Sequence, residues 1–504
     1  MVGLIYIYKV SGENELNITL KEWMVEADIM SLQSAMESGR ISSEELTLAY
    51  IDRIREINPL INAVLELNPD AIDIARSLDA ERKERGSRGK LHGIPILLKD
   101  NIDTGDRMHT SAGSIVLANS IAAKDAFIAA KLREAGAVLL GKANMTEWSN
   151  FMSSRMPAGY SSRGGQVLNP YGPGELFVSG SSSGSAAAVA ANLAAAAIGT
   201  ETAGSIVGPA AQHALVGIKP TVGLASRSGI IPISINQDTP GPLARTVADA
   251  AILLGAIAGW DEHDTLTEVR EEAACLDYTA FLDASYVSHA RIGIPRPYYE
   301  HLDEERLAIM EDAIAALKRE GATIVDNIPL PVEYSNWNQG VVGYEFKQGI
   351  NAYLSRLDES SPVHSLTELI AYHRDHAEQT LKYGQDTLEQ SESVMTKEQY
   401  EQEQASYKER ARRQGIEYLM KRERLDALLL PGDADGKYMA ARMGYPLICV
   451  PAGYSANGII DEDGDSTKGP FGVIFSGLAF SEPTLIKLAY GFEQATRHRI
   501  PPKL

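Results

Sequence analysis

In the first half of the chain, segments with the spacing of amphipathic helices alternate with short runs that are apolar on both faces. Ser42 and Glu45 form the S-x-x-E pattern of a capping box, and the apolar positions after them predict a helix that ends near Glu56. Apolar runs typical of strands buried within a parallel sheet lie at 92–98, 137–141 and 215–220. Further helices are predicted at 70–86, 125–136 and 246–255.

An alanine-rich run stands out between these elements. It reads S185-A-A-A-V-A-A-N-L-A-A-A-A-I-G199 and has no polar face. A helix that is apolar all round belongs in the interior of a protein, where alanine side chains allow close approach of the backbone. We therefore expect a buried helix here.

In the second half of the chain, a long charged and helical region is followed by a return to alternating strands and helices. From about 262 to 424 the segments are long, charged and helical, whereas 425–431 and 446–451 have the pattern of buried strands and 483–496 that of a final helix. This order predicts an α/β fold in which one domain, 1–504, has an α/β/α core formed by about 40–260 and 425–504. The insertion at about 262–424 would be helical and would cover the functional site.

Two short segments are less definite. The first ten residues form either an ordered strand or a disordered extension, since they are too short to span a bilayer and lack a basic leader region. The acidic segment D461-E-D-G-D-S466 lacks the ligand spacing of a calcium loop and is predicted to be a hairpin tip.

Composition excludes several classes of partner. The net charge of −20 opposes binding to nucleic acid or to anionic membranes, and hydrophobic residues make up an ordinary 44% of the chain. No apolar segment is long enough for a transmembrane helix. With only Cys275 and Cys449, a disulfide framework is absent, which favours a reducing compartment such as the cytoplasm.

Candidate chemistry gathers around one lysine and two serine-rich stretches. Lys99 closes the apolar run G93-I-P-I-L-L-K99, and burial there would lower its pKa from about 10.4 and make the neutral amine available as a base. Asp100 points to the opposite face of an extended strand and so does not need to pair with Lys99. The flexible stretch S179-G-S-S-S-G-S185 is able to place Ser181 between Lys99 and Ser205.

A serine that attacks an amide needs hydrogen-bond donors for the oxyanion as well as a base. The turn that ends at Ser205 is able to supply successive backbone N–H groups. The candidate oxyanion donors are Thr202, Ala203, Gly204 and Ser205.

Other interpretations of these residues have less support. Ser182 lies in a G-x-S-x-G pattern, which would make it the nucleophile of an α/β-hydrolase, but no histidine has the supporting context (His364, His373 and His498 follow it). The pair His373 and His376 has spacing suited to a metal, although an exposed helix face explains it better. The S-x-x-K match at Ser87 lies in a charged linker and carries no chemistry.

The motifs resemble those of the amidase signature family, and most of all its peptide amidase branch. The family pattern G-x-P-x-x-x-K-D, G-G-S-S-G-G-S, G-T-D-x-G-G-S-I-R and V-G-L-K-P-T corresponds here to segments at 93–100, 179–185, 199–207 and 216–221. The resemblance implies a mixed central β-sheet covered by helices and a Ser-Ser-Lys triad. Ser205 would be the nucleophile, Lys99 the base and Ser181 the bridging serine, whose peptide bond is cis in the family.

Departures from the family pattern bear on the substrate. Ser179, Ser183 and Ala203 replace glycines, and Val207 replaces an arginine found in many members, including glutamine amidotransferase subunits. Variants shared with peptide amidase-like sequences, such as S162-R-G-G-Q and Q237-D-T-P-G-P, favour a stand-alone hydrolase.

The resemblance therefore implies hydrolysis of neutral linear amides, such as peptide C-terminal amides or small aryl and alkyl amides. It implies no metal, no organic cofactor and no obligate partner chain, with the protein a monomer or homodimer. Asn150 and Ser182 are its candidate substrate-binding residues. The alternatives are the glutaminase subunit of a tRNA-dependent amidotransferase and a non-catalytic family member that acts by binding.

Overall fold

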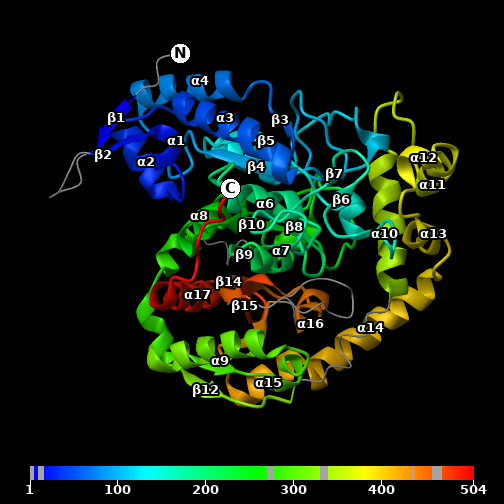
Figure 1. Cartoon of the computed structure of the whole chain (residues 1–504). Coiled ribbons are helices and arrows are strands. Elements are labelled where there is room, and N and C mark those ends of the chain that lie inside the picture. The colour runs from blue at the N-terminus through cyan, green and yellow to red at the C-terminus, as the bar shows by residue number, and fades with distance from the viewer. Residues whose placement is uncertain (1–4, 9–15, 271–276, 330–338, 433–435, 457–467) are drawn as a thin grey trace.

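A computed structural model of the chain describes residues 5–8, 16–270, 277–329, 339–432, 436–456 and 468–504. Its centre is an 11-stranded mixed sheet flanked by helices, as predicted (Figure 1). The strands of this sheet, in spatial order, are β12 (Thr323–Val325), β11 (Arg291–Gly293), β13 (Ala427–Pro431), β15 (Gly469–Ser476), β14 (Leu447–Ser455), β9 (Val216–Lys219), β10 (Thr239–Ala244), β8 (Ala196–Glu201), β4 (Pro95–Lys99), β5 (Val138–Ala143) and β3 (Val64–Leu67).

The sheet consists of two halves, each formed by one continuous part of the chain. One half contains β3, β4, β5, β8, β9 and β10, and the other contains β11 to β15. The halves meet where β9 pairs antiparallel with β14. That pairing aligns only three residue pairs, Lys219 with Leu447, Ile218 with Ile448 and Gly217 with Cys449.

Helices of the first half follow the predicted pattern closely. Ser42 caps its helix through the predicted capping box, and this helix continues to Ile61. The helices of this half are α1 (Leu20–Trp23), α2 (Ile29–Glu37), α3 (Ser43–Ile61), α4 (Ala71–Arg85), α5 (Phe127–Glu134), α6 (Ser183–Ala190), α7 (Val207–Gln212) and α8 (Val247–Ile257).

The alanine-rich run differs from the prediction, because it forms a helix only in its first part. Helix α6 ends at Ala190, Asn192 adopts a left-handed conformation with φ of 59°, and Ala196 then begins the central strand β8. Pairing of β8 with β4 on one side and β10 on the other overrides the helix propensity of alanine. The Asn192 side chain also bonds to Glu26, which fixes the turn between helix and strand.

The predicted insertion is also narrower than expected, because part of it belongs to the sheet. Strands β11 and β12, with the helix between them, extend the sheet beside β13. The helices of the second half are α9 (Glu304–Arg319), α10 (Gln339–Leu354), α11 (Leu366–Asp375), α12 (Ala377–Thr380), α13 (Asp386–Glu392), α14 (Lys397–Gln414), α15 (Ile416–Glu423), α16 (Gly436–Arg442) and α17 (Glu482–Thr496).

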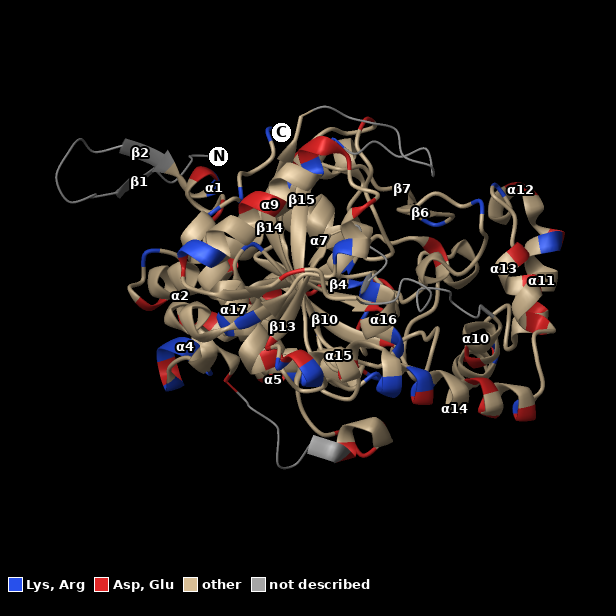
Figure 2. Cartoon of the chain, turned by 90° about the horizontal axis from the view of Figure 1, so that it is seen from below, with Lys and Arg blue, Asp and Glu red and all other residues tan. Residues whose placement is uncertain are grey.

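Helices α10 to α14 form a layer that we call the helical cover. Figure 1 shows them at one side of the molecule, next to the small hairpin of β6 (Tyr160–Ser161) and β7 (Gly165–Gln166). A second hydrophobic cluster holds the cover in place: Phe346, Leu369 and Leu388 pack in it with Trp148 and Met152. Acidic and basic side chains are interspersed along the outer helices, including α14 (Figure 2).

Near the N-terminus, β1 (Ile5–Tyr8) pairs with β2 (Leu16–Thr19). The predicted acidic hairpin tip at 461–466 lies outside the described residues. Within the described part of the chain, no helix combines the length and the apolar character needed to cross a bilayer.

Candidate active site

Strand β4 carries Lys99 to the interior of the protein, where its side chain is fully buried. The Lys99 Nζ lies 2.7 Å from Ser181 Oγ, 3.1 Å from the carbonyl oxygen of Thr200 and 2.9 Å from Thr200 Oγ1. Thr200 lies opposite Pro240 in the β8–β10 ladder, and a proline has no N–H to donate to it. The three contacts fix the amine beside the serine-rich loop.

Burial changes the acid–base properties of this lysine. Desolvation lowers the pKa of Lys99 to about 7, although the charges of Asp238 and Glu201 act in the opposite direction. Asp100 points away, as predicted: its carboxylate lies 3.3 Å from Arg163 and accepts the Gly113 N–H at 2.9 Å. The Lys99 amine therefore exists largely uncharged above neutral pH.

The serine-rich loop places Ser181 against this amine. The Gly180–Ser181 peptide bond is cis, and Ser179 has a left-handed φ of 56° where the family pattern has glycine. The next residue connects the loop to the second serine stretch, since the Ser182 N–H donates to the Ser205 carbonyl oxygen at 3.3 Å. Ser181 and Ser205 thus belong to segments that contact each other directly.

The carboxylate of Glu201 shapes the turn that leads to Ser205. Its oxygens accept the N–H groups of Gly204 at 2.7 Å, Ile206 at 2.7 Å and Val207 at 3.0 Å. This corrects the predicted oxyanion donors, because the Gly204 N–H already has an acceptor. Among the described residues, the N–H groups of Thr202, Ala203 and Ser205 have no such partner.

Gly204 is required in this turn for a different reason. Its φ is +90°, and a Cβ placed on it would lie 2.9 Å from Cε of Lys437. Ala203 does not have a positive φ, which explains why alanine is accepted there in place of the glycine of the family pattern.

Replacing Glu201 by glutamine is expected to lower the free energy of unfolding by about 1–3 kcal/mol, because an amide cannot accept all three buried N–H groups. Thermal unfolding of the variant would measure this loss. Glu175→Gln is the matched control, since Glu175 is exposed on a loop. Equal melting temperatures for both variants would contradict the role of Glu201 in holding the turn.

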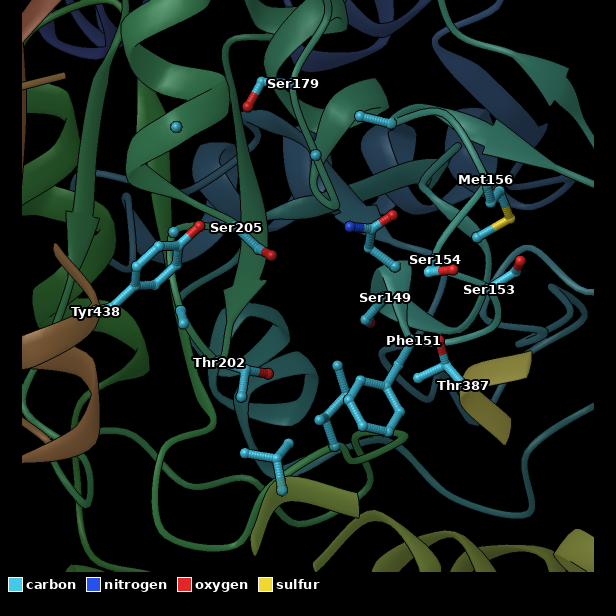
Figure 3. Close-up of a pocket in the computed structure, with 18 of the residues that line it drawn as sticks. Ser149, Phe151, Ser153, Ser154, Met156, Ser179, Thr202, Ser205, Thr387 and Tyr438 are labelled. Carbon is cyan, nitrogen blue, oxygen red and sulfur yellow. The ribbon is translucent and has the colours of Figure 1, made fainter. Parts of the chain in front are cut away.

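Ser205 opens onto a cavity of about 870 Å³. Figure 3 shows its hydroxyl pointing into the cavity from the side of Tyr438, across from Phe151, Ser153 and Ser154. The predicted residue Asn150 lines the same cavity. The helical cover supplies a further part of the wall, formed by Gly340, Val342, Asp386, Thr387, Gln390, Ser391 and Val394.

Asp386 was not predicted, yet it anchors the cover to the loop that carries Asn150. Its Oδ1 accepts the Ser153 hydroxyl at 2.6 Å, and its Oδ2 accepts the Ser154 hydroxyl at 2.6 Å. These hydrogen bonds lower the pKa of Asp386, whereas its partial burial acts in the opposite direction. No sequence motif points to this contact, because the partners are more than 200 positions apart.

Ser182 is not placed to touch a substrate, which corrects its predicted binding role. Its side chain is fully buried, and its hydroxyl donates to the Thr200 carbonyl oxygen at 3.1 Å. The same contact is incompatible with Ser182 as the nucleophile of an α/β-hydrolase. His373 contacts Gln385 and His376 contacts a backbone carbonyl, and within the described residues no cluster of metal-ligating side chains is found.

Comparison with known proteins places this geometry in a family. The model of the Amidase family matches residues 45–486. The chain belongs to the amidase family. A probable amidase of Arabidopsis thaliana is 41% identical over 99% of this chain and 95% of its own length.

Solved structures agree with this assignment. The X-ray structure of the native peptide amidase from Stenotrophomonas maltophilia is 42% identical, with a TM-score of 0.87 over 95% of this amidase and 98% of that chain. A glutamyl-tRNA(Gln) amidotransferase subunit from Alkalilimnicola ehrlichii is 41% identical, but the match covers only 61% of this amidase and 61% of that relative. The amidase is thus an enzyme that hydrolyses amides.

Proposed function

We propose that the amidase hydrolyses neutral linear amides, with peptide C-terminal amides as the first candidates, through an acyl-enzyme on Ser205. The observation that carries this proposal is the buried Lys99 amine, 2.7 Å from Ser181 Oγ, in a loop that contacts the Ser205 segment. Similarity to a peptide amidase over nearly the whole chain supports the substrate class.

The hydrogen bonds around Lys99 suit it to act as a base. A neutral lysine amine has two N–H donors and one lone pair. The carbonyl oxygen of Thr200 accepts one N–H and Thr200 Oγ1 is placed to accept the other. The lone pair then faces the Ser181 hydroxyl, which is the direction needed for proton transfer to Lys99.

In the proposed acylation, Ser205 Oγ attacks the amide carbon while its proton passes to Ser181, and the Ser181 proton passes to Lys99. The N–H groups of the turn at Thr202, Ala203 and Ser205 stabilise the oxyanion. The carbon–nitrogen bond breaks as the protons return along the same path to the leaving amine. Water then attacks the acyl-Ser205 ester by the same relay and releases the acid.

One substitution at the site, Val207 for the family's arginine, supports neutral substrates over glutamine. Val207, at the position of the family's arginine, is fully buried in α7 and offers no cation to a substrate carboxylate. Asp386 and Lys437 are the charged residues among the described residues that line the cavity, whereas serines, amides and apolar side chains form most of its wall. Asn150 lines the cavity, and we propose that its amide binds the substrate's peptide groups.

With the purified single chain, kcat/KM is expected to be at least about tenfold higher for a peptide amide than for free glutamine, because Val207 stands where the family's arginine would bind a carboxylate. A tenfold preference corresponds to about 1.4 kcal/mol of selective binding. Ammonia release measures both rates. A tenfold preference for glutamine would overturn the substrate assignment and favour the amidotransferase interpretation, whose partial similarity is the observation in its favour.

The same purification tests the proposed independence from a partner. We propose that the chain acts as a monomer or homodimer without an obligate partner, and that it works in the cytoplasm, since a sequence with only two cysteines suits a reducing compartment. Size-exclusion chromatography of active enzyme is expected to give one of these two masses. Activity that requires a second kind of chain would contradict this part of the proposal.

A further inference from the structure

Glu345, on helix α10 of the helical cover, is a buried carboxylate that collects four hydrogen bonds. It accepts from the amide of Asn236 at 2.6 Å and from the hydroxyl of Ser234. From α14 it accepts the Tyr400 hydroxyl at 2.7 Å and the Gln404 amide at 2.8 Å. Its exposed fraction is only 4%. Glu345 therefore joins two helices of the cover to the loop at 233–238.

The loop at 233–238, which Glu345 holds through Ser234 and Asn236, ends at a second carboxylate, that of Asp238. Asp238 accepts the N–H groups of Ile233 at 2.7 Å and Ser234 at 2.8 Å, so its position depends on the path of this loop. Its other oxygen accepts the Thr202 hydroxyl at 2.6 Å. A continuous chain of contacts thus leads from α14 and α10, through Glu345 and the loop, to the turn that carries Ser205.

This series of contacts matters for Lys99, the proposed base, because it ends at a carboxylate whose charge acts on Lys99. Asp238 and Glu201 are the acidic groups whose charges favour the protonated form of Lys99. Burial raises the pKa of Asp238 to about 6, whereas its hydrogen bonds with Thr202, Ile233 and Ser234 act in the opposite direction. Glu201 is held by backbone N–H groups and Asp100 faces Arg163, so neither depends on Glu345.

We propose that Glu345 is a positioning residue of the active site, which holds the loop at 233–238 so that Asp238 keeps its hydrogen bond to Thr202 and, through its charge, its effect on Lys99. The helical cover, besides forming the wall of the substrate cavity, thereby helps to set the proton affinity of the base. This inference rests on the proposed role of Lys99 in catalysis.

The test is the pH dependence of kcat/KM for one amide substrate in several variants of the full chain. Asp238→Asn removes a negative charge near Lys99 and should move the acidic limb to lower pH by about 1 unit. Glu345→Gln should move the limb in the same direction. In the Glu345→Gln/Asp238→Asn double variant, the limb should lie where Asp238→Asn alone places it, because both changes act through one group.

Two further variants separate positioning from a general loss of structure. Glu389→Gln breaks the exposed ion pair that this cover residue forms with Arg374, touches neither Glu345 nor Asp238, and should leave the limb at its wild-type pH. Ser234→Ala removes one contact to Glu345 without removing a charge, and should give a smaller shift in the same direction as Glu345→Gln. It also serves if the glutamine variant does not fold.

The outcomes are distinct. An unchanged limb in Glu345→Gln, or in Ser234→Ala where that variant replaces it, would overturn the inference while leaving the proposed function intact, as would fully additive shifts in the double variant. An unchanged limb in Asp238→Asn would also overturn it. Retention of the wild-type limb and activity by Lys99→Ala would instead overturn the proposed function itself.

Discussion

Replacement of Ser205 by alanine is expected to reduce kcat for amide hydrolysis by about 10⁴-fold or more, because the variant has no hydroxyl to accept the acyl group. The fold should remain intact, since the Ser205 contact to Ser182 uses the backbone carbonyl and not the hydroxyl. Ammonia release under substrate saturation measures the loss, and the melting temperature checks the fold.

Chemical labelling provides the control for this assignment. A fluorophosphonate or sulfonyl fluoride should modify Ser205 in the wild-type enzyme, as located by peptide mass analysis, and should leave Ser205→Ala unlabelled. Modification of Ser182 would contradict the assignment and restore the α/β-hydrolase interpretation, although its buried hydroxyl argues against this result.

The second large effect concerns the proton relay. Lys99→Ala should lower kcat/KM by about 10³-fold, the range expected for loss of a general base. Because Lys99 and Ser181 act as one unit, adding Ser181→Ala should lower the rate much less than the product of the two single losses. Steady-state kinetics of the two single variants and the double variant measure this coupling, and fully multiplicative losses would show that the residues act independently.

The wild-type pH profile follows from the same relay. Burial lowers the pKa of Lys99 to about 7, and the protonated amine has no lone pair for the Ser181 proton. Activity should therefore be high above pH 7 and fall as pH decreases through this value. A rate that stays constant down to pH 5 would mean that Lys99 does not titrate as the base.

Local pattern was sufficient to predict much of the first half of the sheet. The apolar run that ends in Lys99 lies buried as β4, and Ser42 caps its helix as expected. The prediction of one helix over the alanine-rich run was wrong. Its composition favours a helix throughout, but its second part pairs with the neighbouring strands β4 and β10 and forms β8. Asn192 was the available signal, since asparagine is accepted in the left-handed conformation that ends a helix.

The structure joins the predicted triad residues to groups that no local pattern identifies. Lys99 and Ser181 are brought together across 82 positions, which the motifs anticipated. Glu345 and Ser234 are 111 positions apart, and Asp386 lies more than 200 positions from Ser153. Such contacts depend on how the cover folds back over the site. The polar residues of the cover follow no regular pattern from which these distant pairings could be predicted.

The three-pair junction between β9 and β14 has a consequence for how the chain is made on the ribosome. All residues of the proposed relay and the strands around them are synthesised first. Strand β9 has no β14 to pair with until more than 200 further residues have been synthesised. During that time the nascent chain exposes the unpaired backbone of a strand whose side chains are buried in the finished protein. An open apolar edge of this kind is a template for association with other chains. Pairing with β14 closes this edge, so the risk of association is confined to the interval before the second half of the chain is made.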